Sequence, residues 1–320
     1  MTGPDPLLTV RDLQVQFGSQ AVLRAVSFEL FCGETVGLVG ESGSGKSTLA
    51  RVILQLLRPA RGSVEFQGLD LLKSSAATVR SQRRNLQIVF QDPLASLNPR
   101  MSIGDAIGEP LKIFEPGLSG SARRGKVGAM LEKVGLSAQM ATRYPHEFSG
   151  GQCQRIGIAR AMILNPRLLI CDEVVSSLDA SIQGQIVNLL LDLQRDTGMA
   201  MLFISHNLAV VRHLSQRVLV MYLGRLVEIA SCDTLFAAPA HPYTRALLAA
   251  VPRILDAAKI PVAAPEQFAA EAAAGSGCAF RDRCPYRLPL CATDDPPLAQ
   301  VVAGHWAACH RSHELLNPLS

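Results

Sequence analysis

The sequence predicts an α/β fold with a largely parallel central sheet, and three observations lead to this prediction. Short apolar segments with strand character alternate with segments of helical spacing along most of the chain. A glycine-rich run at residues 40–47 lies between one such strand and one such helix. The 320 residues are 48% apolar and 18% charged, which is enough to bury a sizeable core in one large domain or two modest ones.

The individual elements can be assigned in chain order. The predicted strands lie at residues 7–39, 86–90, 168–173 and 200–204, followed by a hairpin around Gly224 at 219–230. The predicted helices lie at residues 46–57, within 100–140, at 151–164, at 181–195 and shortly after 207. We expect Pro110 and residues 116–117 to break the 100–140 segment, and a serine to cap the helix at 181–195.

Bulk properties argue against several classes of protein. The net charge of +4 comes without a long basic run, so we expect no nucleic-acid partner. The first ten residues lack a signal-peptide pattern, and the chain has no run of about 18 uncharged apolar residues. We therefore expect membrane association only through partners. We also expect the cysteines to be reduced thiols or metal ligands rather than disulfides.

Residues 40–47, G-E-S-G-S-G-K-S, match the phosphate-binding pattern G-x-x-x-x-G-K-S. The glycines let backbone N–H groups and the N-terminus of the next helix face an anion. We expect Lys46 to reach the β- and γ-phosphates of a nucleotide and Ser47 to ligate Mg²⁺. The flanking strand and helix disfavour the alternative, a purely structural glycine-rich turn.

Polar residues follow two of the apolar strands. Asp172 and Glu173 end the strand at 168–173, where Asp172 suits the Mg²⁺ shell and Glu173 suits a base that orients water. His206 follows the strand at 200–204, at the same edge of the sheet, where ligands of open α/β folds bind. The alternatives are an acid pair at a solvated strand end and a structural histidine.

The run Ser149-Gly150-Gly151-Gln152 has the composition of a second phosphate cradle. Two cradles in one chain indicate that each nucleotide is held between two chains. A self-contained kinase site has no use for this second run, which argues against an unrelated phosphate-loop kinase.

With these residues in hand, the chain resembles the ATPase subunit of ATP-binding cassette transporters, in the oligopeptide/dipeptide/nickel importer group. The resemblance lies in an ordered set of motifs: G-E-S-G-S-G-K-S, V-F-Q-D-P-L-A-S-L-N-P, F-S-G-G-Q, L-L-I-C-D-E, S-S-L-D, I-S-H and the late H-P-Y-T. It implies a nucleotide-binding domain at residues 1–251, with an antiparallel β subdomain and a helical subdomain at about 92–165. A linker rich in Ala and Pro at 252–277 and a Cys-rich extension at 278–320 would follow.

The resemblance also implies roles for single residues. Gln91 would sense Mg²⁺ and water, Asp179 would communicate across a dimer, His206 would contact the γ-phosphate, and Phe17 would stack on adenine unless it is a core aromatic. The segment 92–109 would receive a coupling helix of a membrane subunit. One chain would hold ATP through Gly40, Ser42, Gly43, Ser44, Gly45, Lys46, Ser47 and Thr48. The opposite chain would close on that ATP through Ser149, Gly150, Gly151 and Gln152.

The function implied is ATP hydrolysis that energises import of peptides or a related small solute, through a clamp that ATP closes. The partners implied are a second ATPase subunit (a paralogue or a second copy), two membrane permeases and, through them, an external solute-binding protein. The location implied is peripheral, on the cytoplasmic face of the inner membrane. The alternatives are a non-transport cassette ATPase of a soluble enzyme complex, as in phosphonate breakdown, and a cassette protein of DNA repair or translation.

Four positions depart from the family pattern. Cys153 stands where a basic residue is common, Val174 replaces a proline, Ser177 an alanine and Asn207 an aspartate. None of them is a primary phosphate or metal group, so we expect an active site whose hydrolysis rate these changes affect.

The cysteines of the extension have the spacing Cys278-x5-Cys284-x6-Cys291-x17-Cys309, which differs from the paired C-x2-C of common zinc sites. Thiolates can hold a [4Fe–4S] cluster, and the resemblance implies one here. Free structural thiols, or zinc with His305 or His310, are the alternatives.

Overall fold

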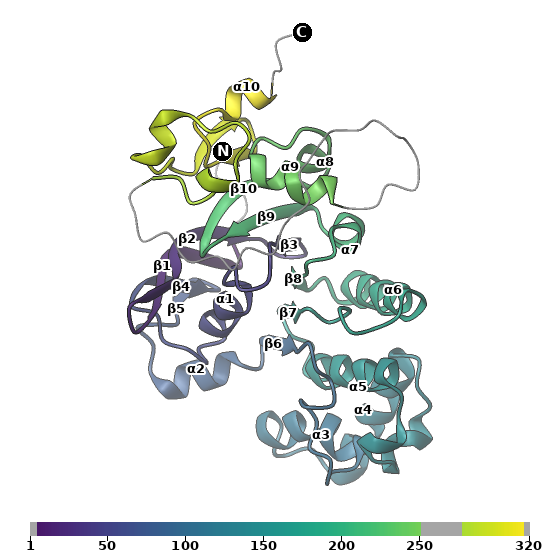
Figure 1. Ribbon diagram of the computed structural model, residues 1–320. Helices are drawn as coiled ribbons and strands as arrows, with labels where there is room; N and C mark the ends of the chain where they lie inside the picture. Colours follow the sequence, from purple (N-terminus) through teal and green to yellow (C-terminus); the bar gives the residue numbers. More distant parts are fainter. Residues whose placement is uncertain (1–4, 251–276, 317–320) are drawn as a thin grey trace.

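The computed structural model describes residues 5–250 and 277–316 (Figure 1). Within these ranges the main sheet is 8-stranded, in the order β11-β12-β10-β9-β3-β8-β7-β6. The strands from β9 to β6 run parallel, whereas β10, β12 and β11 continue the sheet antiparallel. The strand bounds are β3 Thr35–Val39, β6 Leu86–Val89, β7 Leu168–Asp172, β8 Ala200–Ile204, β9 Arg217–Tyr222, β10 Arg225–Ser231, β11 Ala299–Val302 and β12 His305–Ala307. The predicted α/β class is confirmed.

Both faces of β3, β7 and β8 are buried, which explains why these strands are apolar along most of their length rather than alternating. Leu168 and Ile170 of β7 belong to the core cluster that contains helix α1 (Lys46–Ile53), whereas Leu169 and Cys171 belong to the cluster on the other face. The sheet therefore separates two cores, and its carboxyl edge carries the polar residues.

A second, 4-stranded antiparallel sheet covers the α1 side, with the order β2-β1-β4-β5. Its strands are β1 Leu8–Phe17, β2 Gln20–Leu30, β4 Arg61–Phe66 and β5 Leu69–Asp70. Buried apolar residues such as Leu8, Val10 and Leu13 of β1 join the core cluster of α1, so this sheet presses the helix onto β3. The helix that follows it, α2, spans Ala76–Gln82.

Helices α3 (Ile103–Phe114), α4 (Gly120–Lys133) and α5 (Gly150–Met162) pack together at one end of the molecule (Figure 1). The 3-10 turns η1 (Ala138–Thr142) and η2 (Pro145–Glu147) connect α4 to α5. The predicted break at Pro110 is wrong, because Pro110 lies inside α3. Burial of the apolar face around Ile103, Ile107 and Leu111 outweighs the roughly 3 kcal/mol that an interior proline costs.

Helix α6 (Ala180–Thr197) precedes β8, and α7 (Leu208–Leu214) follows it. The predicted serine cap of α6 is wrong, because Asp179 is the N-cap and its carboxylate accepts the Ile182 N–H at 3.0 Å. A short carboxylate satisfies a free N–H group of the first turn and also favours the positive end of the helix dipole.

The Cys-rich extension completes the main sheet, because β12 pairs with β10 through Glu228↔Ala307 and Ile229↔Trp306. Its other elements are η3 Arg281–Arg283, η4 Pro289–Ala292 and α10 Ser312–Leu316, and it is preceded by α8 Cys232–Ala237 and α9 Pro242–Ala249. The predicted linker at 252–277 lies, apart from residue 277, outside the residues that the structure describes.

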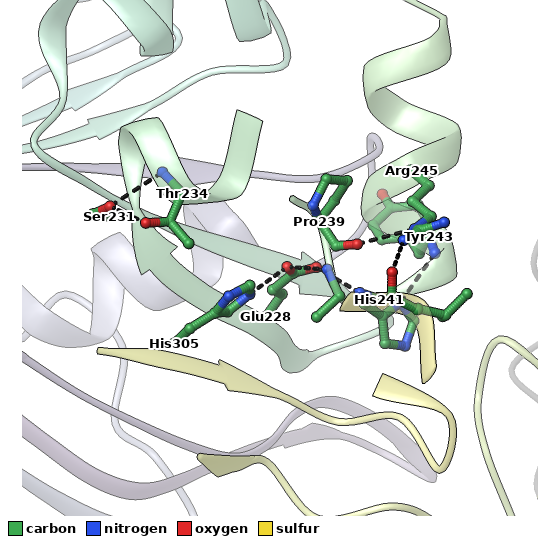
Figure 2. A network of polar contacts seen from close by, with 10 residues as sticks. Glu228, Ser231, Thr234, Pro239, His241, Tyr243, Arg245 and His305 are labelled. Carbon is green, nitrogen blue, oxygen red and sulfur yellow. Dashed lines mark hydrogen bonds and ion pairs between the residues drawn. The ribbon is translucent and has the colours of Figure 1, made fainter. Parts of the chain in front are cut away.

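A buried carboxylate joins the extension to the nucleotide-binding domain predicted at residues 1–251, which we call the cassette (Figure 2). Glu228 of β10 is fully buried and accepts the backbone N–H groups of Ala240 and His241 at 2.7 and 2.9 Å. The Nε2 atom of His305, which opens β12 and is also fully buried, lies 2.7 Å from Oε1 of Glu228. A buried acid is tolerated only with such a set of partners, so cassette and extension depend on each other at this point.

Candidate nucleotide site

The glycine-rich loop follows β3 and leads directly into α1, as predicted. At Gly40 a Cβ atom would lie 2.1 Å from the Met221 carbonyl oxygen, and at Gly45 it would lie 2.9 Å from the Val22 carbonyl oxygen. Gly45 also has a φ of 106°. Only glycine fits these two positions, because the neighbouring strands approach the loop backbone too closely for a side chain.

Lys46 lies buried at the centre of the loop. Its ammonium donates hydrogen bonds to the carbonyl oxygens of Gly40 and Glu41, each at 2.8 Å, and to Oγ of Ser44 at 3.3 Å. Burial lowers the pKa of Lys46, and the nearby acids Glu173, Asp172 and Glu41 oppose that shift. The loop thus concentrates one positive charge where an anion would bind.

Ser47 and Asp172 meet as the sequence predicts. The Ser47 hydroxyl donates to Oδ1 of Asp172 at 3.0 Å, across 125 residues of sequence. Burial raises the pKa of Asp172, an effect that the Ser47 hydrogen bond opposes. A hydroxyl beside a carboxylate fits Mg²⁺, which takes oxygen ligands, few of them from protein, and keeps waters and phosphate oxygens in the rest of its shell.

Glu173 and His206 also meet, at the carboxyl ends of β7 and β8. Oε2 of Glu173 lies 3.4 Å from Nδ1 of His206. Glu173 has a φ of 50°, in the left-handed region, and its N–H donates to the Ile204 carbonyl at 3.0 Å. A non-glycine residue in that region costs of order 1–3 kcal/mol, a strain that clusters at functional sites.

Among the described residues, no hydrogen bond or ion pair joins the remaining predicted residues to this group. Ser149 caps α5 in a reciprocal pair with Gln152, in which the Ser149 N–H donates to Oε1 of Gln152 at 3.0 Å. Gly151 packs against Ile182 of α6. None of the hydrogen bonds or ion pairs of residues 5–250 and 277–316 joins Ser149, Gly150, Gly151 or Gln152 to the glycine loop.

Three further predicted residues have exposed or structural positions. Phe17, at the end of β1, is 52% exposed, so it is not a core aromatic. Gln91 is exposed directly after β6. The backbone N–H of Ile182 lowers the pKa of Asp179, whose cap of α6 is therefore a carboxylate cap. Stacking by Phe17, water sensing by Gln91 and dimer communication by Asp179 stay predictions.

Two of the departures from the family pattern have visible local roles. The Sγ atom of Cys153 is buried and lies 3.6 Å from the Pro145 carbonyl oxygen, so an apolar thiol fills this contact. Asn207 caps α7, since its Oδ1 accepts the N–H groups of Ala209 and Val210 at 3.1 and 3.4 Å. An asparagine caps a helix as well as an aspartate does.

Sequence reasoning missed the role of Glu41 within the glycine loop and of two residues beside it, Arg283 and Tyr243. The Arg283 guanidinium donates to both carboxylate oxygens of Glu41, at 2.9 and 2.8 Å, and Oη of Tyr243 accepts the Glu41 N–H at 2.8 Å. The sequence contained one indication of this contact. Glu41 is an acid inside a phosphate-binding loop, and such an acid needs a nearby cation. A pocket of about 290 Å³ adjoins the loop and is lined by Gln20, Ala21, Val22, Arg24, Glu41, Ser42, Gly43, Ser44, Tyr222 and Leu223.

The four cysteines of the extension lie in one region. Burial raises the pKa of the thiols of Cys278, Cys284 and Cys309, and the nearby Cys291 adds to each of these shifts. In the part of the chain that the structure describes, however, no group of three or more His, Cys, Asp or Glu is placed to hold a metal ion. The [4Fe–4S] prediction is therefore not supported.

Across residues 5–250 and 277–316, none of the helices is sufficiently long and apolar to traverse a bilayer.

Comparison with known proteins gives matches along most of the chain. The "ABC transporter" family model matches residues 23–176, and the "Oligopeptide/dipeptide transporter, C-terminal region" model matches residues 227–291. The chain is 50% identical over 312 residues to the oligopeptide transport ATP-binding protein OppF of Escherichia coli, covering 92% of this chain and 93% of OppF. A putative peptide import ATP-binding protein of Brucella ovis is 49% identical over 318 residues, covering 96% of this chain and 98% of the relative.

Solved structures agree with this assignment. CbiO1 of Clostridium perfringens, part of the ABC transporter complex cbiONQ, matches with a TM-score of 0.66 and 26% identity, covering 73% of this chain and 91% of its own. The dimeric ATP-binding cassette MJ0796, bound to ADP and phosphate, matches with a TM-score of 0.65 and 27% identity, covering 70% and 98%. With the loop, acid and histidine geometry described above, these matches show that the chain belongs to the ATPase subunits of ATP-binding cassette transporters.

Proposed function

We propose that this ATPase energises import of peptides or a related small solute. The observation that carries the proposal is the series of contacts at one sheet edge: Lys46 in its loop, Ser47 on Asp172, and Glu173 beside His206. The oligopeptide and peptide import relatives support the solute class. The alternative of a soluble phosphonate-type complex has no such support.

The chain's own residues divide the work of hydrolysis. The glycine loop and Lys46 bind the nucleotide's phosphates, and Ser47 and Asp172 hold Mg²⁺, which offsets phosphate charge. Glu173 orients the attacking water and accepts its proton, His206 contacts the γ-phosphate, and Gln91 senses Mg²⁺ and the attacking water. Phe17, exposed at the end of β1, stacks on adenine. ATP and Mg²⁺ suffice for this chemistry, and no step passes through the cysteines.

The second cradle acts on a partner's nucleotide. Ser149 and Gly150 are exposed at the N-terminus of α5, and no hydrogen bond or ion pair of the described residues joins them to their own glycine loop, so they are placed to close on the ATP of a second subunit. Asp179 is exposed at the start of α6, the helix whose Ile182 packs against Gly151. ATP then draws two subunits together, and hydrolysis releases them.

The membrane partners receive this motion through residues 92–109. Leu94 is 50% exposed in this segment, and Phe90 just before it is 38% exposed, which suits a contact with an apolar helix. The complete importer holds two ATPase subunits, two permeases and an external solute-binding protein, with this chain peripheral on the cytoplasmic face of the inner membrane. Residues 1–251 form its cassette, 252–277 the linker and 278–320 the extension.

The test is purification of the tagged full chain from detergent-solubilised membranes, followed by identification of bound chains and a solute-stimulated ATPase assay. We expect two permeases and an ATPase partner, with activity that rises when peptide-loaded binding protein is added. A soluble complex without a permease would contradict the transport function.

A further inference from the structure

The Cys-rich extension reaches the phosphate-binding loop directly. Arg283, in η3 of the extension, forms a bidentate ion pair with Glu41, the second residue of the loop, 242 positions away. Parallel N–H···O bonds of this kind are among the strongest charge-assisted contacts and fix both side chains in one geometry.

Aromatic side chains hold Arg283 in place. Its guanidinium carbon lies 5.5 Å from the Phe280 ring centroid and 5.8 Å from that of Tyr222. Tyr222 belongs to β9 and Phe280 to the extension, and their rings meet edge to face at 5.3 Å. The guanidinium is therefore confined between cassette and extension, because both supply a face that attracts a cation.

Glu41 is held at its backbone as well. The hydroxyl of Tyr243, a fully buried residue of α9, accepts the Glu41 N–H, while the Glu41 carbonyl accepts the Lys46 ammonium. The Tyr243 ring packs on Tyr222 and Phe280, with centroids 4.6 and 5.5 Å away. The aromatic cluster that supports Arg283 thus also sets the path of the loop backbone.

The charge of Glu41 explains why this matters for nucleotide binding. A carboxylate in a loop that binds phosphates repels the incoming anion and competes for Lys46, whose charged form Glu41 already favours. A bidentate arginine cancels that negative charge and removes the carboxylate from competition. The loop then presents its N–H groups and Lys46 to the phosphates.

We propose that Arg283 is a positioning residue for ATP, which neutralises Glu41 and so frees Lys46 and the N–H groups of the loop for the phosphates; ATP affinity therefore depends on the docked extension. The inference rests on the proposed function only in assuming that residues 40–47 bind ATP. Docking itself is secured elsewhere, by the Glu228–His305 contact and the β10–β12 pairing.

The test measures ATP binding to the full chain by calorimetry, together with the kcat and KM of its ATPase in the assembled complex. We expect Arg283→Gln to weaken ATP binding by about 10- to 100-fold and to raise KM far more than it lowers kcat. Arg283→Lys, which keeps the charge and loses the bidentate geometry, should restore part of the affinity. Arg287→Gln is the matched control, because Arg287 lies in the same extension and pairs only weakly with Asp282, at 3.7 Å.

The double variant Glu41→Gln/Arg283→Gln decides the mechanism. If Arg283 acts by neutralising Glu41, removal of the acid restores affinity to within about threefold of the parent. If the double variant binds as weakly as Arg283→Gln, the arginine is merely structural and the inference is wrong. Unchanged affinity in Arg283→Gln overturns it as well, whereas a parent chain that binds no ATP overturns the proposed function instead.

Discussion

The Nδ1 atom of His206 lies 3.4 Å from the Oε2 atom of Glu173, across the carboxyl ends of two adjacent parallel strands. Glu173 is largely buried and His206 largely exposed, with side chains 19% and 58% accessible. The histidine can therefore contact a ligand from the solvent side while it orients the acid beneath it. The proposed function places hydrolysis at this end of the site.

Replacement of Glu173 by Gln should remove hydrolysis and leave ATP binding intact. The amide keeps the shape of the side chain and cannot accept a proton, so we expect ATPase activity to fall by about 10²- to 10⁴-fold. The assay is phosphate release by the complex with its partner subunits, with Asp196→Asn, an exposed change on α6, as control. Undiminished phosphate release would exclude Glu173 as the base.

Replacement of Gly151 by Ala should separate ATP binding from turnover. The new Cβ would lie 2.7 Å from Cγ2 of Ile182, so the start of α5 must shift away from α6. We expect the isolated subunit to bind ATP normally and the complex to lose about 10²-fold in ATPase rate. Gly184→Ala on α6 points into open space and should leave the rate unchanged. Equal rates for both variants would argue against the second cradle.

The buried histidine of the H-P-Y-T run predicts a loss of stability in mild acid. Burial lowers the pKa of His241 from 6.5 to about 4, so the folded chain keeps it neutral while the unfolded chain takes up a proton. The contribution of neutral His241 to the free energy of unfolding is complete above pH 6.5. It is lost as the pH falls toward 4, by about 1.4 kcal/mol per pH unit.

Urea unfolding between pH 7 and 5 measures this effect. His241→Asn keeps a side-chain acceptor for the Tyr243 N–H, which now bonds Nδ1 at 3.0 Å, but it cannot titrate. The variant should therefore show a shallower pH dependence than the parent. His213→Asn, an exposed change on α7, should retain the parent's slope. Identical slopes for all three chains would refute the assignment.

The cysteines should differ sharply in reactivity. Burial raises the pKa of Cys309 to about 11 and also raises those of Cys278 and Cys284, so few reactive thiolates form there at pH 8. Cys32 is exposed. Alkylation followed by peptide mapping should label Cys32 rapidly and the other three slowly. Stoichiometric iron, with thiols that become reactive only after chelation, would instead restore the iron–sulfur interpretation.

Local pattern predicted most of the cassette. Apolar runs ending in polar residues placed Asp172 and His206 at one sheet edge, because parallel strands end together. The hydrogen bond from Ser47 to Asp172 and the contact between Glu173 and His206 follow from that placement. Sequence pattern failed where tertiary packing determines the secondary structure, as in helix α3, which continues through Pro110.

The contacts of the extension were harder to predict, because they join residues far apart in sequence. No periodicity in the sequence connects Arg283 with Glu41. The cysteine spacing indicated a metal site and gave no sign of a role for Arg283, which lies between Cys278 and Cys284. Likewise, Trp306 and Ala307 carry too short a strand signal to reveal that they extend the main sheet. Such pairings depend on the whole fold.

The order in which the chain is made gives the β10–β12 pairing a further consequence. Strand β10 and the buried carboxylate of Glu228 receive their last partner only when His305 has been synthesised, 77 residues later. A product released early would carry a bare strand edge and an incompletely bonded internal acid, which are features that promote self-association and degradation. The sheet thus makes translation through β12 a condition for a stable ATPase.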